Sequence, residues 1–292
     1  MAASFCPGFH HAGHSSRETR VAFNEVVAWV QIWSSALQVK VDKRFSQGLG
    51  FLVAYTWSKT LTDAESQFSE FSGFTANRYD RKAEKSYSIN DYPHNLVLNY
   101  TYELPLGPGK RWAKAGGAAG MVIGGWKIAG ISQYQSGSPS TVYLDAGNMM
   151  WPYAGTNNFM ARPNVVPGVP MKSAALISGD FDPNRDTMFN PAAFAIPDPW
   201  TFGNGSRAYG NARRFAYLNE DLSIIKRTEG TDRVILEFRA DFLNILNRTV
   251  FGLGTGGDQY GSALEGFASA PGLISSQSNY PREIQFGLRL TY

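Results

Sequence analysis

The residues best suited to metal chemistry lie close to the N-terminus. They supply one thiol and three imidazoles, the ligand types that bind zinc: Cys6, His10, His11 and His14. Their Cys-x3-His-His-x2-His spacing matches no standard zinc module, and the segment lacks the periodicity of a helix or strand. Because Cys6 is the only cysteine, the chain also has no internal disulfide. We expect no metal site here.

A second group of possible ligands follows the spacing of a calcium-binding loop. Carboxylate and amide side chains recur at every second position from Asp180 to Asp186. However, Arg185 occupies the sixth position, where such loops carry glycine, and Pro191 occupies the twelfth, where they carry glutamate. A solvated acidic loop explains the pattern better, and we expect no cofactor.

No set of residues predicts catalysis. Gly252, Gly254 and Gly257 fit a dinucleotide-binding spacing, but no strand–helix–strand pattern surrounds them. His94 is the only histidine outside the N-terminal cluster, so a serine–histidine–aspartate triad is not available. The paired carboxylates of the 236–242 segment are better explained as a charge ladder on a strand. We therefore expect the protein not to be an enzyme.

Composition narrows the class of protein further. The 292 residues include 14% aromatic and 17% charged residues, and the net charge is only +3. This charge composition does not predict the polybasic surface that binds nucleic acids, so no nucleic-acid partner is expected. No run approaches the length of an apolar transmembrane helix. The composition does not exclude a transmembrane β-barrel, because the strands of a barrel alternate and give a weak hydropathy signal.

The elements that position these residues are predicted to be strands. Side chains alternate between apolar and polar with a period of two, in seven segments: 37–42, 49–58, 95–104, 126–135, 219–224, 236–242 and 283–292. The connections alternate too. Tight turns or moderate segments occur on one side (46–48, 105–125, 228–232), and long polar loops on the other (60–92, 137–215, 248–279). This asymmetry is typical of outer-membrane barrels, whose long loops are extracellular.

The two faces of the predicted strands differ as a barrel requires. Aromatic residues gather near strand ends, as in the girdles at lipid-headgroup level: Tyr55, Trp57, Tyr100, Tyr102, Trp126 and Tyr134. Polar residues on the opposite face suit a water-filled lumen: Asn219, Asp221, Glu237, Arg239, Asp241 and Arg289. We predict an all-β fold, an antiparallel transmembrane β-barrel with long extracellular loops.

The last eight residues match the terminal signal of bacterial outer-membrane barrels. Gln285, Gly287, Leu290 and Tyr292 occupy its polar, glycine, apolar and terminal aromatic places. A final strand with an open edge can pair with the assembly machinery before the barrel closes. Barrel assembly machinery and outer-membrane lipid are therefore expected partners.

Several strings together resemble the C-terminal barrel of Oar-like TonB-dependent receptors, over about residues 36–292. They are 36–41, 43–49, 54–59, 189–194 (Phe-Asn-Pro-Ala-Ala-Phe), 201–204, 238–247 (Phe-Arg-Ala-Asp-Phe-Leu-Asn-Ile-Leu-Asn) and 281–288. The resemblance implies a transporter for a large nutrient or chelate. In that family a barrel of about 22 strands is plugged by an N-terminal domain and energised by TonB.

The chain departs from that family at its N-terminus. Residues 1–35 show no signal peptide, no TonB box and no plug, and are expected to be an unstructured segment before the barrel portion at 36–292. An odd number of strands would also place this segment outside the cell, whereas bacterial barrels have even counts. We therefore expect the last seven strands of a larger barrel, a fragment that does not transport alone but belongs to the outer membrane.

Two other functions fit parts of the pattern. A small porin-like or adhesin-like barrel could be completed by oligomerisation, with sheet edges paired between chains. A soluble secreted carbohydrate-binding β domain would also alternate. That function would not explain the terminal signal, and a domain of this kind is expected to have short connections throughout, unlike the long ones of this chain.

Overall fold

The computed structural model describes residues 21–23, 26–28, 31–63, 80–113, 116–145, 162–198, 201–231, 234–253, 259–262 and 274–292. Helices in these segments are short, and none is long and apolar enough to cross a membrane. Strands dominate the described chain, and the predicted all-β class is confirmed.

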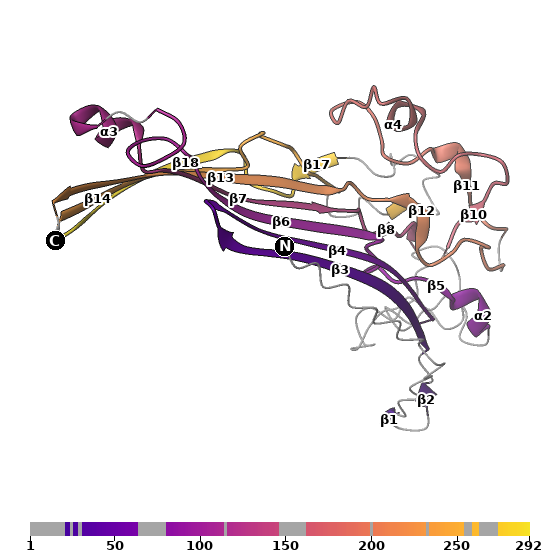
Figure 1. The fold of residues 1–292 in the computed structure, drawn as a ribbon. Helices are drawn as coiled ribbons and strands as arrows, with labels where there is room; N and C mark the ends of the chain where they lie inside the picture. The colour runs from indigo at the N-terminus through magenta and orange to yellow at the C-terminus, as the bar shows by residue number, and fades with distance from the viewer. Residues whose placement is uncertain are drawn as a thin grey trace.

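One antiparallel sheet organises the molecule (Figure 1). Its long strands are β3 (Ile32–Ser46), β4 (Leu49–Thr62), β6 (His94–Glu103), β7 (Trp126–Gln135), β13 (Tyr217–Thr231), β14 (Val234–Leu243) and β18 (Glu283–Thr291). They pair in the order β18-β14-β13-β7-β6-β4-β3, with the short β5 (Ser86–Tyr87) beside β4. The order follows the chain, so each long strand neighbours the one before it. All seven predicted strands are present, and the sheet does not close on itself within the described residues.

Strand ends differ from the sequence prediction in two places. β3 begins at Ile32, before the predicted boundary at residue 36, and pairs with β4 from its first residue. β13 runs to Thr231, although residues 228–232 were expected to be a turn. The polar residues Thr228 and Glu229 continue the ladder opposite Leu236 and Ile235, because pairing with β14 extends the strand beyond its apolar alternation.

The tightest turn joins β3 to β4. Gln47 and Gly48 both have positive φ angles, of 52° and 82°, between the paired residues Ser46 and Leu49. Positive φ at both central residues matches the right-handed twist of a hairpin, and glycine adopts it without strain. The Gly48 carbonyl accepts a hydrogen bond from the Glu103 amide at 2.7 Å, which ties the turn to β6.

The connections collect at the two ends of the sheet (Figure 1). The short-turn end carries the β3–β4 turn, the C-terminus and α3 (Gly117–Ile123). The long-loop end carries the other elements of the three long connections. These are α2 (Arg81–Glu84), β8 (Pro139–Ser140), β9 (Tyr143–Asp145), β10 (Asn164–Val165), α4 (Ala174–Ser178), η2 (Pro191–Ala193), β11 (Phe194–Ala195), β12 (Tyr209–Arg213), β15 (Phe251–Leu253), β16 (Gln259–Ser262) and β17 (Ile274–Gln277). A separate small pair, β1 (Val21–Phe23) and β2 (Val26–Ala28), precedes the sheet.

The register separates an apolar face from a polar face. Residues opposite one another in a ladder point to the same side of a sheet. One continuous row contains Val39, Tyr55, Leu96, Tyr134 and Leu218. The row one residue away contains Gln38, Thr56, Asn95 and Gln135. Each long strand therefore contributes to one apolar and one polar surface, as a barrel wall does.

The apolar face of the sheet is not the core of the described structure. On β18, Phe286 and Leu288 are each 71% exposed, and Leu37, Trp57 and Leu236 on other strands are also exposed. In a protein folded in water, this face would be buried against a second layer. An uncovered apolar face on a sheet of this size is what lipid contact requires.

The hydrophobic core lies instead within the connection between β7 and β13. Its buried members are Val142, Leu144, Met188, Phe189, Ala193, Phe194, Tyr209 and Ala212. The ring of Phe194 packs edge-on against those of Phe189 and Tyr209. This connection was expected to be a polar loop, but hydrophobic residues separated by up to about 70 positions collapse together into a folded unit.

Candidate functional site

The six predicted lumen residues share the polar face of the sheet. On β14, Glu237 lies between Arg227 of β13 and Arg289 of β18 in the ladder. Arg239 and Asp241 follow on the same side, two and four residues along the strand. Asn219 and Asp221 continue this face toward the long-loop end, and the Asn219 amide donates to Asp221 at 3.0 Å. The structure thus brings all six together, and their contact with lumen water stays a prediction.

Hydrogen bonds on this face form both between neighbouring strands and along a single strand. Asp241 accepts from the Ser223 hydroxyl at 2.5 Å and from Arg239 Nε at 2.7 Å. Exposed ion pairs of this kind contribute little to stability. On β14 the charges of Glu237, Arg239 and Asp241 alternate, and the Asp241 carboxylate is paired with a cation and a hydroxyl of the same face.

The six predicted girdle residues lie on the opposite, apolar face and divide between its two ends. Tyr55, Trp57 and Tyr134 lie toward the long-loop end. Tyr100, Tyr102 and Trp126 lie toward the short-turn end. Aromatic rings at both ends of an apolar band are typical of the two membrane–water interfaces, and their role as a girdle stays a prediction.

Two of these aromatic residues make contacts that fix their rings. Tyr100 lies across Gly130 on the neighbouring strand, where a Cβ atom would come within 2.5 Å of the tyrosine hydroxyl. The Tyr55 hydroxyl is 2.8 Å from Nδ1 of His94, and the two rings are stacked. His94, the only histidine outside the N-terminal cluster, therefore contacts a tyrosine on the apolar face.

The predicted C-terminal signal occupies the edge strand. Gln285 and Gly287 lie on the polar face, opposite Asp241 and Arg239. Leu290 lies on the apolar face opposite Leu236, and Tyr292 follows directly after the strand. Within the described residues β18 pairs only with β14, so its other backbone edge is available for strand addition.

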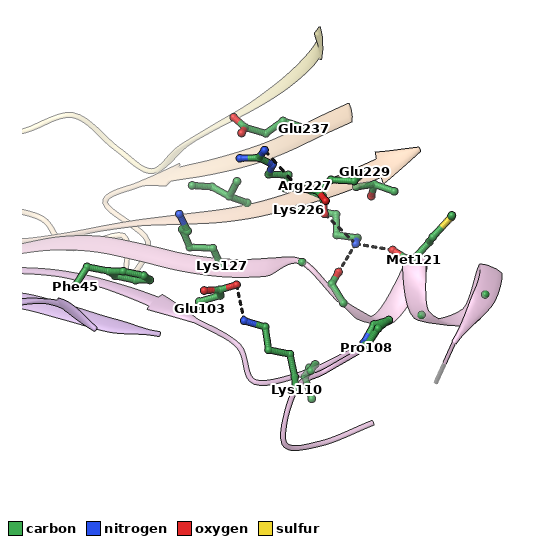
Figure 2. A pocket seen from close by; sticks show the side chains of 17 residues that line it. Phe45, Glu103, Pro108, Lys110, Met121, Lys127, Lys226, Arg227, Glu229 and Glu237 are labelled. Atoms are coloured by element: carbon green, nitrogen blue, oxygen red, sulfur yellow. Dashed lines mark hydrogen bonds and ion pairs between the residues drawn. The ribbon is translucent and has the colours of Figure 1, made fainter. Parts of the chain in front are cut away.

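A cavity of about 700 Å³ opens at the short-turn end of the sheet (Figure 2). Its walls are the ends of β6, β7, β13 and β14 and the segment that contains α3. Lys110 and Glu103 form an ion pair of 3.0 Å in its wall. Lys226 donates to the Met121 carbonyl at 2.6 Å and also to the Gly124 carbonyl, and so anchors the α3 segment to β13. The charges lining the cavity are of both signs, so they define no single ligand class.

Buried ion pairs join the long connections to one another. Asp91, which is 1% exposed, bonds Arg213 at 2.5 Å, and Glu84 bonds Arg162. Arg207 donates to the Thr62 carbonyl at 2.7 Å. These pairs link residues 60–92 to residues 162–213. Sequence reasoning missed them, because partners separated by 78 and 122 positions leave no local pattern.

A second hydrogen-bond cluster holds the base of the last long connection. Asn244 is 4% exposed and has a φ of 49°. Its Nδ2 donates to the Arg248 and Tyr280 carbonyls at 2.9 and 3.0 Å, and its Oδ1 accepts from the Arg248 amide at 2.8 Å. The Val250 amide donates to Asn279 at 2.8 Å, so asparagines join both ends of the connection. The string at 238–247 contains two residues with positive φ, Asn244 and Asn247.

Charge also fixes the start of this connection to β13. Nε of Arg248 lies 2.9 Å from both carboxylate oxygens of Glu220. This bond and the attraction of the Glu220 charge raise the pKa of Arg248 above its usual range. Glu220 lies on the apolar side of β13 near the long-loop end, and a carboxylate there is compensated by the guanidinium.

Outside the sheet, the acidic motif forms no metal site within the described chain. Asp182 accepts from the Asn184 amide at 2.9 Å and Asp186 accepts from the Asp182 amide at 2.8 Å, so this acidic turn binds its own backbone. No three acidic, histidine or cysteine side chains converge as metal ligands in the segments that the structure describes. The Cys6 cluster, Gly254 and Gly257 lie outside the described residues.

Together, the open antiparallel sheet, its uncovered apolar face and its polar opposite face define a membrane-spanning β-barrel wall. The family comparison agrees: a model described as "Outer membrane beta barrel domain" matches residues 19–285. The chain belongs to this family and is an outer-membrane protein. No curated protein matches it.

Proposed function

We propose that the chain is the C-terminal barrel portion of an Oar-like TonB-dependent receptor, which takes up a large nutrient or chelate in the intact protein. The proposal rests on the strings that resemble that family and on where they lie in the structure. The 189–194 string forms the centre of the core between β7 and β13, where Asn190 caps the short helix η2 through the Ala192 amide. The 238–247 string forms β14 and the asparagine turn.

The folded long-loop end is the single observation that favours a receptor over a simple pore. A receptor must hold a selective surface outside the membrane, and flexible loops would lose entropy on binding. Here the connection between β7 and β13 has its own hydrophobic core, and buried ion pairs join it to residues 60–92. A folded connection at the long-loop end, joined to residues 60–92, supports ligand recognition.

The proposed partners follow from the same interpretation. They are outer-membrane lipid on the apolar face, the barrel assembly machinery at β18, and TonB together with a plug in the intact receptor. We also propose a transport role rather than an enzymatic one, because His94 contacts Tyr55, and Asp241 on the polar face already binds Arg239 and Ser223.

Uptake measured in the source cell tests this proposal. Radiolabelled ferric chelates and malto-oligosaccharides serve as probes, and three strains are compared: the parent, a strain lacking this gene, and a strain lacking TonB. We expect one probe to enter the parent only, with an equal loss in both deletion strains. Uptake that needs this gene but continues without TonB would refute the receptor proposal and favour a porin.

A second candidate function is a porin-like or adhesin-like barrel completed by several copies. The observation in its favour is that β3 and β18 are both edge strands within the described residues. In a chain whose own Cys6 is replaced by serine, cysteines placed at Val39 and Leu288 would form a disulfide between chains if these edges meet. Dimers on a non-reducing gel would support this candidate, and exclusively monomeric protein in the outer membrane would count against it.

A further inference from the structure

Two lysines on the apolar side of the sheet have their ammonium groups above aromatic rings. Nζ of Lys85 lies 3.8 Å from the centre of the Trp33 ring, and Nζ of Lys59 lies 5.6 Å from that of Tyr87. Trp33, Leu61 and Tyr87 form one row across β3, β4 and β5, so both rings belong to the same face at the long-loop end.

Carboxylates do not neutralise these two lysines within the described residues. The acidic side chains nearest in sequence are committed elsewhere: Asp63 bonds Arg81 at 2.5 Å, and Glu84 bonds Arg162. Arg213 also lies over Tyr87, at 5.4 Å, but it bonds Asp91. Lys59 and Lys85 are exposed and hold positive charge beside the aromatic band.

The opposite end of the same face is arranged differently. Lys226 lies 5.7 Å from the Trp126 ring, but its ammonium donates to the carbonyls of Met121 and Gly124. The protein itself therefore satisfies the lysine at the short-turn end. Lys127 lies over Phe45 at the short-turn end, but it extends from the polar face of β7, where it is paired with Glu103 in the ladder. Among the described residues of the apolar face, the lysines over rings that keep hydrogen-bond donors for an outside acceptor are Lys59 and Lys85 at the long-loop end.

The position of these lysines limits what that acceptor can be. A lysine on the lipid face is costly at the centre of the bilayer and nearly free of cost at its surface. Lys59 lies near the end of β4, which reaches Thr62, and Lys85 lies beyond the strands that span the apolar band. Both ammonium groups are therefore placed at headgroup level, where phosphate is the available anion.

We propose that Trp33, Lys59, Lys85 and Tyr87 form a site for the phosphate of a lipid headgroup in the leaflet at the long-loop end. The rings position the ammonium groups, which donate to phosphate oxygens, while the acyl chains lie along the apolar face beside Trp57. The site requires only that the sheet spans the outer membrane, so it can hold even if the receptor proposal fails.

Native mass spectrometry of the full chain tests the site. The chain is folded in zwitterionic micelles with equal amounts of phosphatidic acid and phosphatidylcholine of the same acyl length, and the two bound lipids are compared. A basic residue near an anionic headgroup is worth about fivefold in affinity. We expect wild type to prefer phosphatidic acid, and K59Q or K85Q to lower the preference about fivefold each.

Matched variants separate this site from general charge and from misfolding. K40Q removes the same charge from the polar face and should leave the preference unchanged. K59R and K85R keep the charge and should retain it, whereas W33L keeps both lysines and should weaken it. Heat-modifiable migration on a gel reports whether each variant has folded.

Three results would overturn the proposal. Equal binding of the two lipids by wild type would show that the site does not select phosphate. An unchanged preference in folded K59Q and K85Q would place any selectivity elsewhere. Loss of the bound lipid to millimolar inorganic phosphate would show a site for free anions rather than for a lipid.

Discussion

Replacing Asn244 should show how strongly the base of the last long connection depends on one side chain. In Asn244→Gly the three side-chain hydrogen bonds to Arg248 and Tyr280 are lost, while the positive φ of 49° is still tolerated. Each bond is worth about 1 kcal/mol net. Water can reach Tyr280, which is 81% exposed, and Asn279 still donates to the Arg248 carbonyl. We therefore expect a loss of about 2 kcal/mol.

Asn244→Ala should cost more than Asn244→Gly. Alanine loses the same hydrogen bonds and must also hold a left-handed backbone, which adds about 1 to 2 kcal/mol. The total is about 3 to 4 kcal/mol. A comparison of the two variants separates the hydrogen bonds from the backbone conformation.

The assay is the urea concentration at which the heat-modifiable folded band disappears, for chain refolded in phosphatidylcholine vesicles. Asn247→Gly is the matched control, because Asn247 has a φ of 50° but its side chain accepts, within the described part of the chain, one hydrogen bond, from the Arg282 amide. We expect the order wild type, Asn247→Gly, Asn244→Gly, Asn244→Ala from most to least stable. Equal midpoints for the two Asn244 variants would refute the backbone argument, and a midpoint equal to wild type for Asn244→Gly would refute the hydrogen-bond argument.

Three further results are expected. Burial raises the pKa of Tyr209 from 10.0 to about 12. The neutral hydroxyl therefore adds to the free energy of unfolding in full below pH 10, and this contribution of about 3 kcal/mol is lost as the pH rises from 10 to 12. Stability curves should show this loss in wild type but not in Tyr209→Phe. Arg213→Met leaves the Asp91 carboxylate buried without its cation, so limited proteolysis should cut residues 80–92 faster, unlike in a control variant of the exposed Arg185, Arg185→Met; equal rates would contradict the role of the pair. Deletion of Tyr292 should slow assembly into the outer membrane, and unchanged heat-modifiable yield would count against the terminal signal.

The sheet could be predicted from the sequence because its physics is local. A strand with one face in lipid and one in water must alternate, and every long strand carries that pattern. The strand ends were predicted less well, because the alternation stops there. Ser34 and Ser35 interrupt it at the start of β3, and Thr228 and Glu229 interrupt it at the end of β13. In both places, pairing with the neighbouring strand determines the structure.

The long-loop end could not be predicted in the same way. Its core joins Val142 to Ala212, and its ion pairs join Asp91 to Arg213, across stretches with no repeating pattern. The strings at 189–194 and 238–247 indicated a family resemblance but not these features. Their physical basis is a capped turn next to Phe194 and a hydrogen-bonded turn at Asn244, and both depend on contacts formed only in the folded chain.

The separate core at the long-loop end means that one chain folds in two solvents. Val142, Phe189 and Tyr209 come together because water expels them, whereas the strands gain nothing from water on their apolar side and need lipid. Urea acts on the first process through the aqueous phase, while bilayer thickness and composition act on the second. Unfolding of this protein should therefore occur in two transitions. During assembly, the core between β7 and β13 becomes stable in water, whereas the sheet becomes stable only in the membrane.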